Sequence, residues 1–341
     1  MTGRGRSGTR AARRYRYGGR VRKSHVGKRL AMVTGLVAML VLGLTGCGDD
    51  AGAPRALVIG SADQPAMRVM AEIYTGALRN AGSVVSDDHP LGDDATLLEE
   101  MDRAEIDLFP AFTGELLSLL APSSTAVGAE EVYVDLNRSL PQGVSVGDET
   151  PVSDAPQLFV STTLAGTLGV SGLDDCALLP PGLPVVVTSD PEPSTLKAFA
   201  DAGCRLGPVE TVPTTEEVLV RASQGDAIGL LTPLDIAGED AEGASSDVQA
   251  LRTPAGEGEN ADEPPAGGSA EKPRDAAVSG PRAEMLVPVF RTAALNRDQV
   301  KTMNKVAGEI TTADLATMAG EVQTGGDPRE VAQEWLAEHG L

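Results

Sequence analysis

The sequence predicts an α/β protein of two lobes, and three observations carry this prediction. Residues 56–109 alternate short apolar runs with amphipathic stretches in the order strand, helix, strand, helix, strand. That order favours right-handed crossovers and a mainly parallel sheet. A similar alternation of apolar runs and amphipathic stretches occupies residues 157–231. The length of 341 residues is also sufficient for two lobes.

The first lobe is expected over residues 56–155. Pro110 has no backbone N–H, so we expect it to end a strand at 106–109. Ser61 is expected to cap the helix that follows the first strand. Apolar periodicity assigns the other elements: strands at 56–60 and 84–85, and helices at 63–80, 94–104, 130–140 and, after a turn at 113–114, up to residue 120.

The second lobe is expected over residues 156–237. Periodicity places its strands at 157–161, 185–187 and 228–231 and its helices at 194–202 and 214–224. The chain then returns to the first lobe over 285–341, with a strand at 285–290 and helices at 297–307, 312–321 and 328–338. Thr311 or Thr312, and Asp327, are suitable N-caps for the last two helices.

Residues 238–284 differ from both lobes in composition. Apart from 248–251, they are Gly, Pro, Ala, Ser, Glu and Asp with almost no large apolar residue. Such a stretch cannot bury enough apolar surface to offset the entropy lost on ordering. We therefore expect an acidic insert whose core, 253–282, is a disordered surface loop, and an inert loop is its simplest interpretation.

The N-terminal segment has the features of a lipoprotein signal peptide over residues 1–46. Its first 29 residues are basic, and an apolar run from Leu30 to Leu44 follows, too short for a comfortable membrane span. Leu44-Thr45-Gly46-Cys47 resembles the bacterial lipobox, so we expect Cys47 to carry diacylglycerol and residues 47–55 to form a tether. This predicts a lipid-anchored protein on the extracytoplasmic face of the cell membrane. A plain anchor helix with a chance cysteine is the alternative.

The charge balance argues against nucleic acid as a partner. The chain has 49 Asp and Glu against 28 Lys and Arg, a formal net charge of −21. Residues 1–46 contain no Asp or Glu, so the rest of the chain is more acidic still. A polyanion or an anionic membrane surface would repel it.

Two cysteines, Cys176 and Cys204, remain beyond the lipobox. Outside the cytoplasm an even pair of cysteines is usually a disulfide, so we expect a bridge between them. Two buried thiols are the alternative.

The sequence offers no pattern typical of a catalytic or metal site. His89 and His339 are the only histidines beyond residue 46, and neither has the neighbouring ligands of a metal site. No nucleophile elbow, phosphate loop or dinucleotide glycine motif occurs. We expect no cofactor, no metal and no enzymatic activity; a hydrolase using Asp93-Asp94 or Asp174-Asp175 is the catalytic alternative.

The segment Glu105-Ile106-Asp107-Leu108-Phe109-Pro110-Ala111-Phe112-Thr113-Gly114 resembles a family motif. It is similar to G-E-I-D-L-Y-P-E-Y-T-G-T of the osmoprotectant-binding proteins of ABC importers, the receptors for glycine betaine, choline and proline betaine. The strand at 286–291 and the closing helices also resemble that family. The resemblance implies a two-lobed periplasmic-binding-protein fold of type II with a hinge between the lobes, a monomer, a small solute such as a quaternary amine, and partner permease and ATPase subunits.

The resemblance also implies a set of ligand-binding positions. Phe112, Thr113 and Gly114 match the family's Y-T-G, Ser61 matches the serine of its first loop, and Thr232 lies near the second hinge. In that family an aromatic cage holds the quaternary ammonium, and basic or N–H groups hold the carboxylate. Backbone N–H groups at the start of the helix after the turn are expected to be free for a negative group.

Several of these positions depart from the family pattern. Glu115 replaces a threonine, and Ala283-Glu284-Met285 stands where the family has an aromatic cluster. Aromatic residues make up only 3% of the chain. We therefore predict a solute other than glycine betaine. Two alternatives remain: Phe109 and Phe112 are both core residues, or the chain is a lipoprotein of this fold with a degenerate pocket, acting in envelope interaction or sensing.

Overall fold

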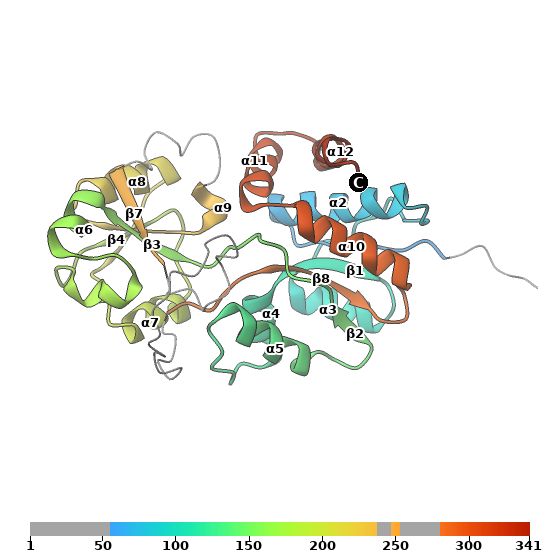
Figure 1. Cartoon of the computed structure of the whole chain (residues 1–341), viewed down its shortest axis with the longest axis horizontal. Coiled ribbons are helices and arrows are strands. Elements are labelled where there is room, and N and C mark those ends of the chain that lie inside the picture. Colours follow the sequence, from blue (N-terminus) through green and yellow to red (C-terminus); the bar gives the residue numbers. More distant parts are fainter. Residues whose placement is uncertain (1–54, 237–246, 253–279) are drawn as a thin grey trace, which may run out of the picture. The chain divides into compact units, whose positions relative to one another are not determined.

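Two β-sheets organise the chain in the computed structural model, which describes residues 55–236, 247–252 and 280–341 (Figure 1). The predicted signal peptide, Cys47 and residues 253–279 of the predicted insert lie outside these residues. The first sheet has the order β1-β8-β2, in which both pairs are antiparallel: β1 is Leu108–Phe112, β8 is Leu286–Arg291 and β2 is Val144–Val146. Isolated parallel bridges extend it beyond β1, joining Ile59 to Leu108 and Leu57 to Val85.

The second sheet has the order β5-β4-β6-β3-β7. Its strands are β3 Gln157–Ser161, β4 Val185–Val187, β5 Val209–Thr211, β6 Ile228–Leu231 and β7 Val248–Leu251. β4 runs parallel to β5 and β6, whereas β3 runs antiparallel to β6 and β7. The two-lobed α/β class is confirmed, but its sheets are mixed rather than mainly parallel. The chain enters the second sheet at β3 and returns to the first sheet at β8. Both strands are antiparallel to their neighbours.

Helices of the first lobe pack around α2. They are α2 Pro65–Asn80, α3 Asp94–Asp102, α4 Thr113–Leu120, α5 Ala129–Ser139, α10 Arg297–Glu309, α11 Thr312–Gln323 and α12 Pro328–His339. Met70, Ile73, Tyr74 and Leu78 of α2 are fully buried in a core that includes Trp335 of α12. Burial of each such aliphatic side chain stabilises the fold by roughly 1.5–3 kcal/mol.

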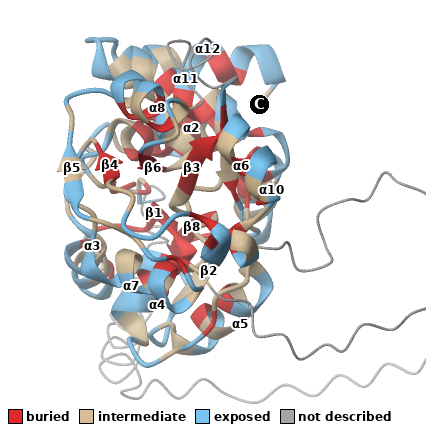
Figure 2. Cartoon of the chain, turned by 90° about the vertical axis from the view of Figure 1, so that its left-hand side faces the viewer, coloured by how far each residue is buried: buried red, intermediate tan, exposed pale blue. Residues whose placement is uncertain are grey.

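The second lobe has shorter helices around the valines of β4. They are α6 Thr162–Leu168, the 3-10 helix η1 Leu173–Leu178, α7 Pro193–Asp201, α8 Thr215–Ser223 and α9 Pro233–Ile236. Val185 and Val187 face a core with Phe199, and Val186 faces a second core with Phe159 and Val218. This alternation places apolar side chains on both faces of the sheet, as the buried strands in Figure 2 show. Within the described ranges, no helix combines the length and apolar character that a bilayer span requires.

Most predicted elements agree with the structure to within a few residues, including the two final helix caps. The hydroxyl of Thr311 accepts a hydrogen bond from Asp314 N, and the carboxylate of Asp327 accepts one from Arg329 N. The prediction for Ser61 is wrong. Gln64 is the N-cap of α2, and the extended segment runs on through Ser61, which bridges to Leu91.

The expectation that Pro110 ends its strand is also wrong, because β1 continues to Phe112. Pro110 faces Pro288 of β8. The carbonyl oxygen of Asp107 accepts from Arg291 N, and Thr113 N donates to the carbonyl oxygen of Met285. Hydrogen-bonded and non-hydrogen-bonded pairs alternate along an antiparallel ladder, so the Pro110 pair is a non-hydrogen-bonded one. No N–H is needed toward β8 at that position, so two prolines can face each other without breaking the ladder.

Two described segments fall within the predicted insert. Residues 248–251 form β7 and complete the second sheet beside β3. Residues 280–284 are also described, and they form hydrogen bonds with the first lobe. The sequence analysis set 248–251 apart as the apolar exception within the insert, but such short segments have too little periodicity to be assigned to a sheet.

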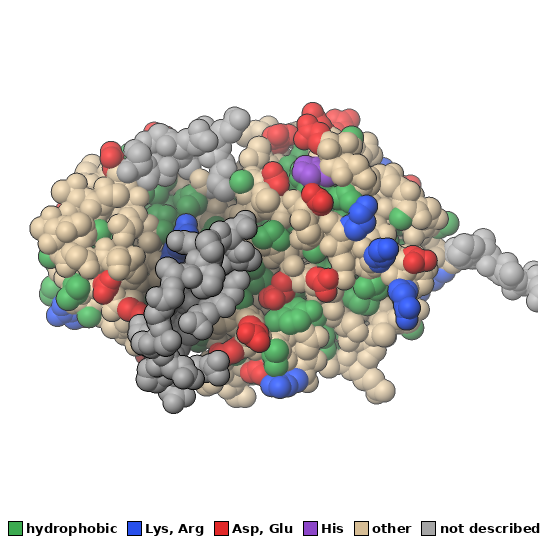
Figure 3. Space-filling model, in the orientation of Figure 1, with side chains coloured by type: hydrophobic (Ala, Val, Ile, Leu, Met, Phe, Trp, Pro, Cys, Tyr) green, Lys and Arg blue, Asp and Glu red, His purple; other side chains and the backbone are tan. Residues whose placement is uncertain are grey.

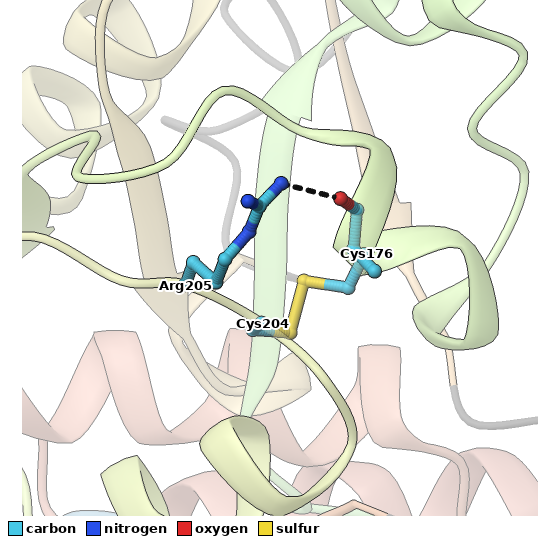
Figure 4. Close-up of a disulfide and its surroundings, with 4 residues drawn as sticks. Cys176, Cys204 and Arg205 are labelled. Atoms are coloured by element: carbon cyan, nitrogen blue, oxygen red, sulfur yellow. Dashed lines mark hydrogen bonds between the residues drawn. A yellow bond between two sulfur atoms is a disulfide. The ribbon is translucent and has the colours of Figure 1, made fainter.

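The predicted disulfide is present (Figure 4). Cys176 of η1 and Cys204, which follows α7, are both buried. Arg205, next to Cys204, donates from Nη2 to the carbonyl oxygen of Ala177, next to Cys176, at 2.8 Å. This hydrogen bond joins the same two segments as the disulfide. The bridge therefore ties η1 to the end of α7 within the second lobe.

Replacing both cysteines with serine is expected to lower the free energy of unfolding by about 3–4 kcal/mol, because a bridge across a sequence separation of 28 restricts the unfolded chain. Urea unfolding of wild type and of Cys176→Ser/Cys204→Ser, with and without reductant, measures this difference. Reductant should destabilise the wild type only. Equal unfolding midpoints for the oxidised wild type and the double variant would contradict the prediction.

Candidate functional site

The two connections between the sheets lie side by side. One leads from β2 to β3, and the other leads into β8. Ser153 and Met285 form an antiparallel bridge, and Asp154 N donates to the carbonyl oxygen of Glu284 at 2.9 Å. The chain thus passes between the lobes through a pair of strands joined by hydrogen bonds, each with an acidic residue at the crossing.

The start of α4 is attached to this crossing. Thr113, the first residue of α4, is completely buried. Its N–H donates to the carbonyl oxygen of Met285 at 2.9 Å, and its hydroxyl oxygen accepts from Met285 N at 3.0 Å. The predicted turn at Thr113 and Gly114 therefore begins the helix directly and orients it against the returning chain.

A carboxylate of the chain itself occupies the N-terminus of α4. Glu284 Oε2 accepts hydrogen bonds from Gly114 N at 2.8 Å and Glu115 N at 2.9 Å. These are two of the N–H groups that a helix start leaves without an intrahelical partner. A Cβ atom at Gly114 would lie 2.6 Å from the carbonyl oxygen of Ala283, so only glycine allows this approach. The expectation that these N–H groups are free for an outside anion is wrong.

Arg282 fixes the position of this carboxylate. Its guanidinium donates to the carbonyl oxygens of Ser124 and Ala126, at 2.7 and 3.0 Å, and to the Ser118 hydroxyl at 2.6 Å. Two hydrogen bonds to the loop between α4 and α5 and one to Ser118 of α4 hold the chain just before Glu284. Sequence reasoning assigned both residues to the insert and missed their role; an arginine within an otherwise acidic, Gly- and Pro-rich stretch was the available signal.

Three further acidic side chains come from separate segments: Asp94 at the start of α3, Glu115 in the first turn of α4 and Asp154 in the crossing. Glu115 and Asp154 are close enough to raise the pKa of Glu284, and Glu115 is close enough to raise that of Asp94. Together with Glu284, the three are called the acidic cluster below. Among the described residues, no Lys or Arg forms an ion pair with any of the four. Figure 3 shows acidic side chains gathered on the face over α4.

Lost hydration and mutual repulsion favour the protonated forms in this cluster. Burial, with Glu115 and Asp154 nearby, raises the pKa of Glu284 to about 8 despite the two N–H donors. Burial raises the pKa of Asp154 to about 7, with Asp235 and Glu115 adding to it, and that of Asp94 to about 7. Lost hydration and the second-lobe residue Glu192 raise the pKa of Glu115, although that residue as a whole stays exposed.

The five predicted ligand-binding residues fall into two groups. Thr113 and Gly114 lie at the acidic cluster, and the Thr232 side chain is close enough to Asp154 to lower the pKa of that carboxyl. Phe112 is only 8% exposed and belongs to the core of the first lobe, and Ser61 is buried in its bridge to Leu91. Phe109 is fully buried as well. The structure thus agrees with the alternative in which both phenylalanines are core residues.

A separate pocket of 180 Å³ lies between α2 and α12. It is lined by residues that include Glu72, Thr75, Arg79, Arg329 and Gln333, and by none of the predicted ligand-binding residues. Its charged groups already pair with one another, since Arg329 lies 3.6 Å from Glu72 and both arginines contact Asp87.

The carboxylate pairs of the hydrolase alternative have structural partners. Asp93 caps α3 by accepting a hydrogen bond from Thr96 N at 2.8 Å. Asp175 accepts from the backbone N–H and the hydroxyl of Ser171, at 2.9 and 2.7 Å. Over the part of the chain that the structure describes, no three His, Cys, Asp or Glu side chains are arranged to hold a metal ion.

The raised pKa values predict that stability decreases as pH rises. Between about pH 4, where free carboxyl groups titrate, and about pH 8, the folded protein binds more protons than the unfolded chain. The stability that these extra bound protons contribute is fully present below about pH 4 and is lost as the pH rises toward about 8. Urea unfolding from pH 5 to 8 should show a falling unfolding midpoint.

Two variants, each of which removes one negative charge, test whether the acidic cluster causes this dependence of the unfolding midpoint on pH. Asp154→Asn should flatten it, whereas Glu130→Gln, a change on the exposed start of α5, should leave it intact. A wild-type midpoint that rises or stays constant from pH 5 to 8 would contradict the assignment.

Comparisons with known proteins agree with the two-sheet architecture. A family model described as the substrate binding domain of ABC-type glycine betaine transport systems matches residues 55–192 and 242–338, more than half of the chain. Apo YehZ from Escherichia coli superposes with a TM-score of 0.58 and 16% identity, covering 84% of this chain and 99% of that one.

A second solved structure, a glycine betaine/carnitine/choline ABC transporter, superposes with a TM-score of 0.60 and 13% identity. The match covers 83% of this chain and 98% of that one. At such identities the likeness establishes the fold alone. No curated protein sequence matches the chain. The family match covers the first lobe, both connections and the part of the second lobe that lies outside residues 193–241. This chain belongs to the family of substrate-binding domains of ABC-type glycine betaine transport systems.

Proposed function

We propose that this protein is an extracytoplasmic, lipid-anchored receptor that delivers a small solute to the permease of an ABC importer. The single observation that carries the proposal is the family match over residues 55–192 and 242–338. The structure agrees with this role, since two sheets with separate cores are joined by a pair of adjacent connections. Rotation about such a pair is how hinged receptors close over a ligand.

The anchor follows from the sequence. Leu44-Thr45-Gly46-Cys47 ends an apolar run behind a basic segment, which is the arrangement that directs lipidation of a cysteine. Attached acyl chains hold a protein at the membrane surface, and two or more give stable anchoring. The permease and the ATPase would be separate chains, and the receptor acts as a monomer without enzymatic activity.

A second candidate function has a specific observation in its favour. Phe112, at the position of the family's cage tyrosine, is a core residue, and Glu284 occupies the N–H groups of α4. Both features are consistent with a lipoprotein that has kept the fold, lost transport, and works in envelope interaction or sensing. Solute uptake by wild-type and deletion strains distinguishes the two, because only a receptor for import is needed for uptake.

A solute should stabilise the purified protein. A ligand at one hundred times its dissociation constant adds about 2.7 kcal/mol to the free energy of unfolding, which is visible as a thermal shift. The panel should include zwitterionic betaines, organic cations, amino acids and sugars. An uncharged osmolyte at equal concentration controls for general solvent effects. If no solute shifts the midpoint, the receptor role is wrong.

Replacing Cys47 with serine is expected to release the protein from the membrane. The variant lacks the sulfur that forms the thioether to diacylglycerol, so membrane fractions should lose it and it should not incorporate labelled palmitate. Cys176→Ser serves as the control, because it removes a cysteine beyond the lipobox and leaves the anchor unchanged. Equal membrane retention of wild type and Cys47→Ser would contradict the anchor.

A further inference from the structure

The pocket between α2 and α12, called the α2–α12 pocket below, is separate from the crossing between the lobes. α12 packs against α2 in the first lobe (Figure 1). Glu72, Thr75 and Arg79 line the pocket from α2, at spacings of three and four residues that place them on one face of the helix. Arg329 and Gln333 line it from α12. None of these residues belongs to the acidic cluster or to the predicted ligand-binding positions.

Thr75 has a buried hydroxyl without a partner. The residue is only 1% exposed, and its Oγ1 forms no hydrogen bond with any described residue. A helical threonine can satisfy its hydroxyl at the carbonyl oxygen one turn earlier, as Thr302 of α10 does toward Asp298 at 3.0 Å. A buried hydroxyl without a partner destabilises a fold, so each one requires an explanation. Since Thr75 lines the pocket, a molecule in the pocket can supply the missing partner.

The charges around the pocket balance one another. Glu72 Oε2 lies 3.6 Å from Arg329 Nε. Asp87 Oδ1 lies 2.8 Å from Arg79 Nη2 and 3.1 Å from Arg329 Nη2. An anion in the pocket would therefore meet Glu72 and Asp87, and a cation would meet two guanidinium groups. This balance favours a neutral ligand.

Both acceptors and donors are nevertheless available to such a ligand. Among the described residues, none donates a hydrogen bond to the Glu72 carboxylate; His89 Nε2 lies 3.3 Å from its Oε1 but forms no hydrogen bond. The described hydrogen bonds of Arg79 all start from Nη2, which leaves Nε and Nη1 for other acceptors. A hydroxyl group both donates and accepts, so neighbouring hydroxyls of one molecule can serve a carboxylate and a guanidinium together.

The size of the pocket and its apolar wall limit the ligand further. Leu336 and Gly76 form the wall, and a Cβ atom at position 76 would collide with Leu336 Cδ1. The volume of 180 Å³ corresponds to roughly six waters at about 30 Å³ each, so it suits a molecule of about six to ten non-hydrogen atoms. C–H groups of that molecule can lie on Leu336 while its polar groups face the charged side.

We propose that the α2–α12 pocket binds a small neutral polyhydroxy molecule, of the size of a tetritol or a pentose. Its hydroxyls donate to Glu72, accept from Arg79 and Arg329, and give the buried Thr75 hydroxyl its hydrogen bond. This site is additional to the one in which an importer receptor holds its solute. The inference does not rest on the receptor role, because it uses only residues of α2 and α12.

Titration of the purified protein with defined probes tests the proposal. Trp335, the one tryptophan of the chain, precedes Leu336 in α12, so its fluorescence reports on the pocket. Erythritol or D-xylose should give a saturable change in this fluorescence or in the amide NMR shifts of α2 and α12. Acetate and methylammonium should bind at least tenfold more weakly than the better polyol. The proposal is overturned if neither polyol saturates, or if a charged probe binds as tightly.

The Thr75 hydroxyl can be removed with little change of shape. Thr75→Val should weaken polyol binding at least tenfold, while the unfolding midpoint of the free protein should not fall, because no hydrogen bond is lost. Thr302→Val is the matched control: it removes a hydroxyl that is hydrogen-bonded within α10 and should leave binding unchanged. Full polyol affinity in Thr75→Val would refute the proposal.

Filling the pocket gives an independent test. Ala337 is exposed on α12 and lines the pocket, so Ala337→Leu should block it and abolish polyol binding. Glu334→Leu places the same side chain at an exposed position of α12 outside the lining and should bind normally. Equal affinity in the two variants would contradict the site. A solute whose thermal shift persists in Ala337→Leu binds elsewhere, so the receptor role is tested independently of this pocket.

Discussion

The hydrogen bonds between the Glu284 carboxylate and the start of α4 determine how the lobes of this protein are joined. They attach the segment that returns from the second lobe to the helix that follows β1. The same segment pairs with the outgoing connection through Asp154 N, so both crossings and α4 form one hydrogen-bonded unit. Any relative motion of the lobes must leave this unit intact or break several hydrogen bonds at once.

This arrangement has an electrostatic cost that the fold offsets only in part. The dipole and N–H groups of a helix start favour a carboxylate, typically by 0.3–1 kcal/mol at exposed positions. Crowding by Glu115 and Asp154 opposes that gain and, together with burial, raises the pKa of Glu284 to about 8. Structural stability alone would favour a neutral hydrogen-bond acceptor here, because it would satisfy the N–H groups without adding charge. A group of acids with raised pKa values is a pattern that functional sites share.

Much of the fold could be predicted from periodicity, because buried strands and helices depend on local apolar patterns. The strands at Val185–Val187 and Ile228–Leu231 were placed correctly for that reason. Pro110 was misread because its effect depends on the register with Pro288, which lies far away in the sequence. The candidate site was the least predictable part. The positions of Thr113 and Gly114 followed from a local motif, but Arg282 and Glu284 act through contacts with residues more than 150 positions earlier.

Fold and ligand are specified by different residues in this chain, which explains how the family relationship can coexist with a changed site. The match to the glycine betaine family covers the first lobe and part of the second, and it includes the segments that form α2 and β4. Ligand charge, in contrast, depends on a few side chains at the crossing. Glu284 stands within a segment where the resemblance predicted aromatic residues, and a single carboxylate there satisfies the N–H groups that would otherwise receive the carboxylate of a zwitterion. The start of α4 is therefore already paired with a carboxylate of the chain itself, while the strands and helices of the family fold are in place.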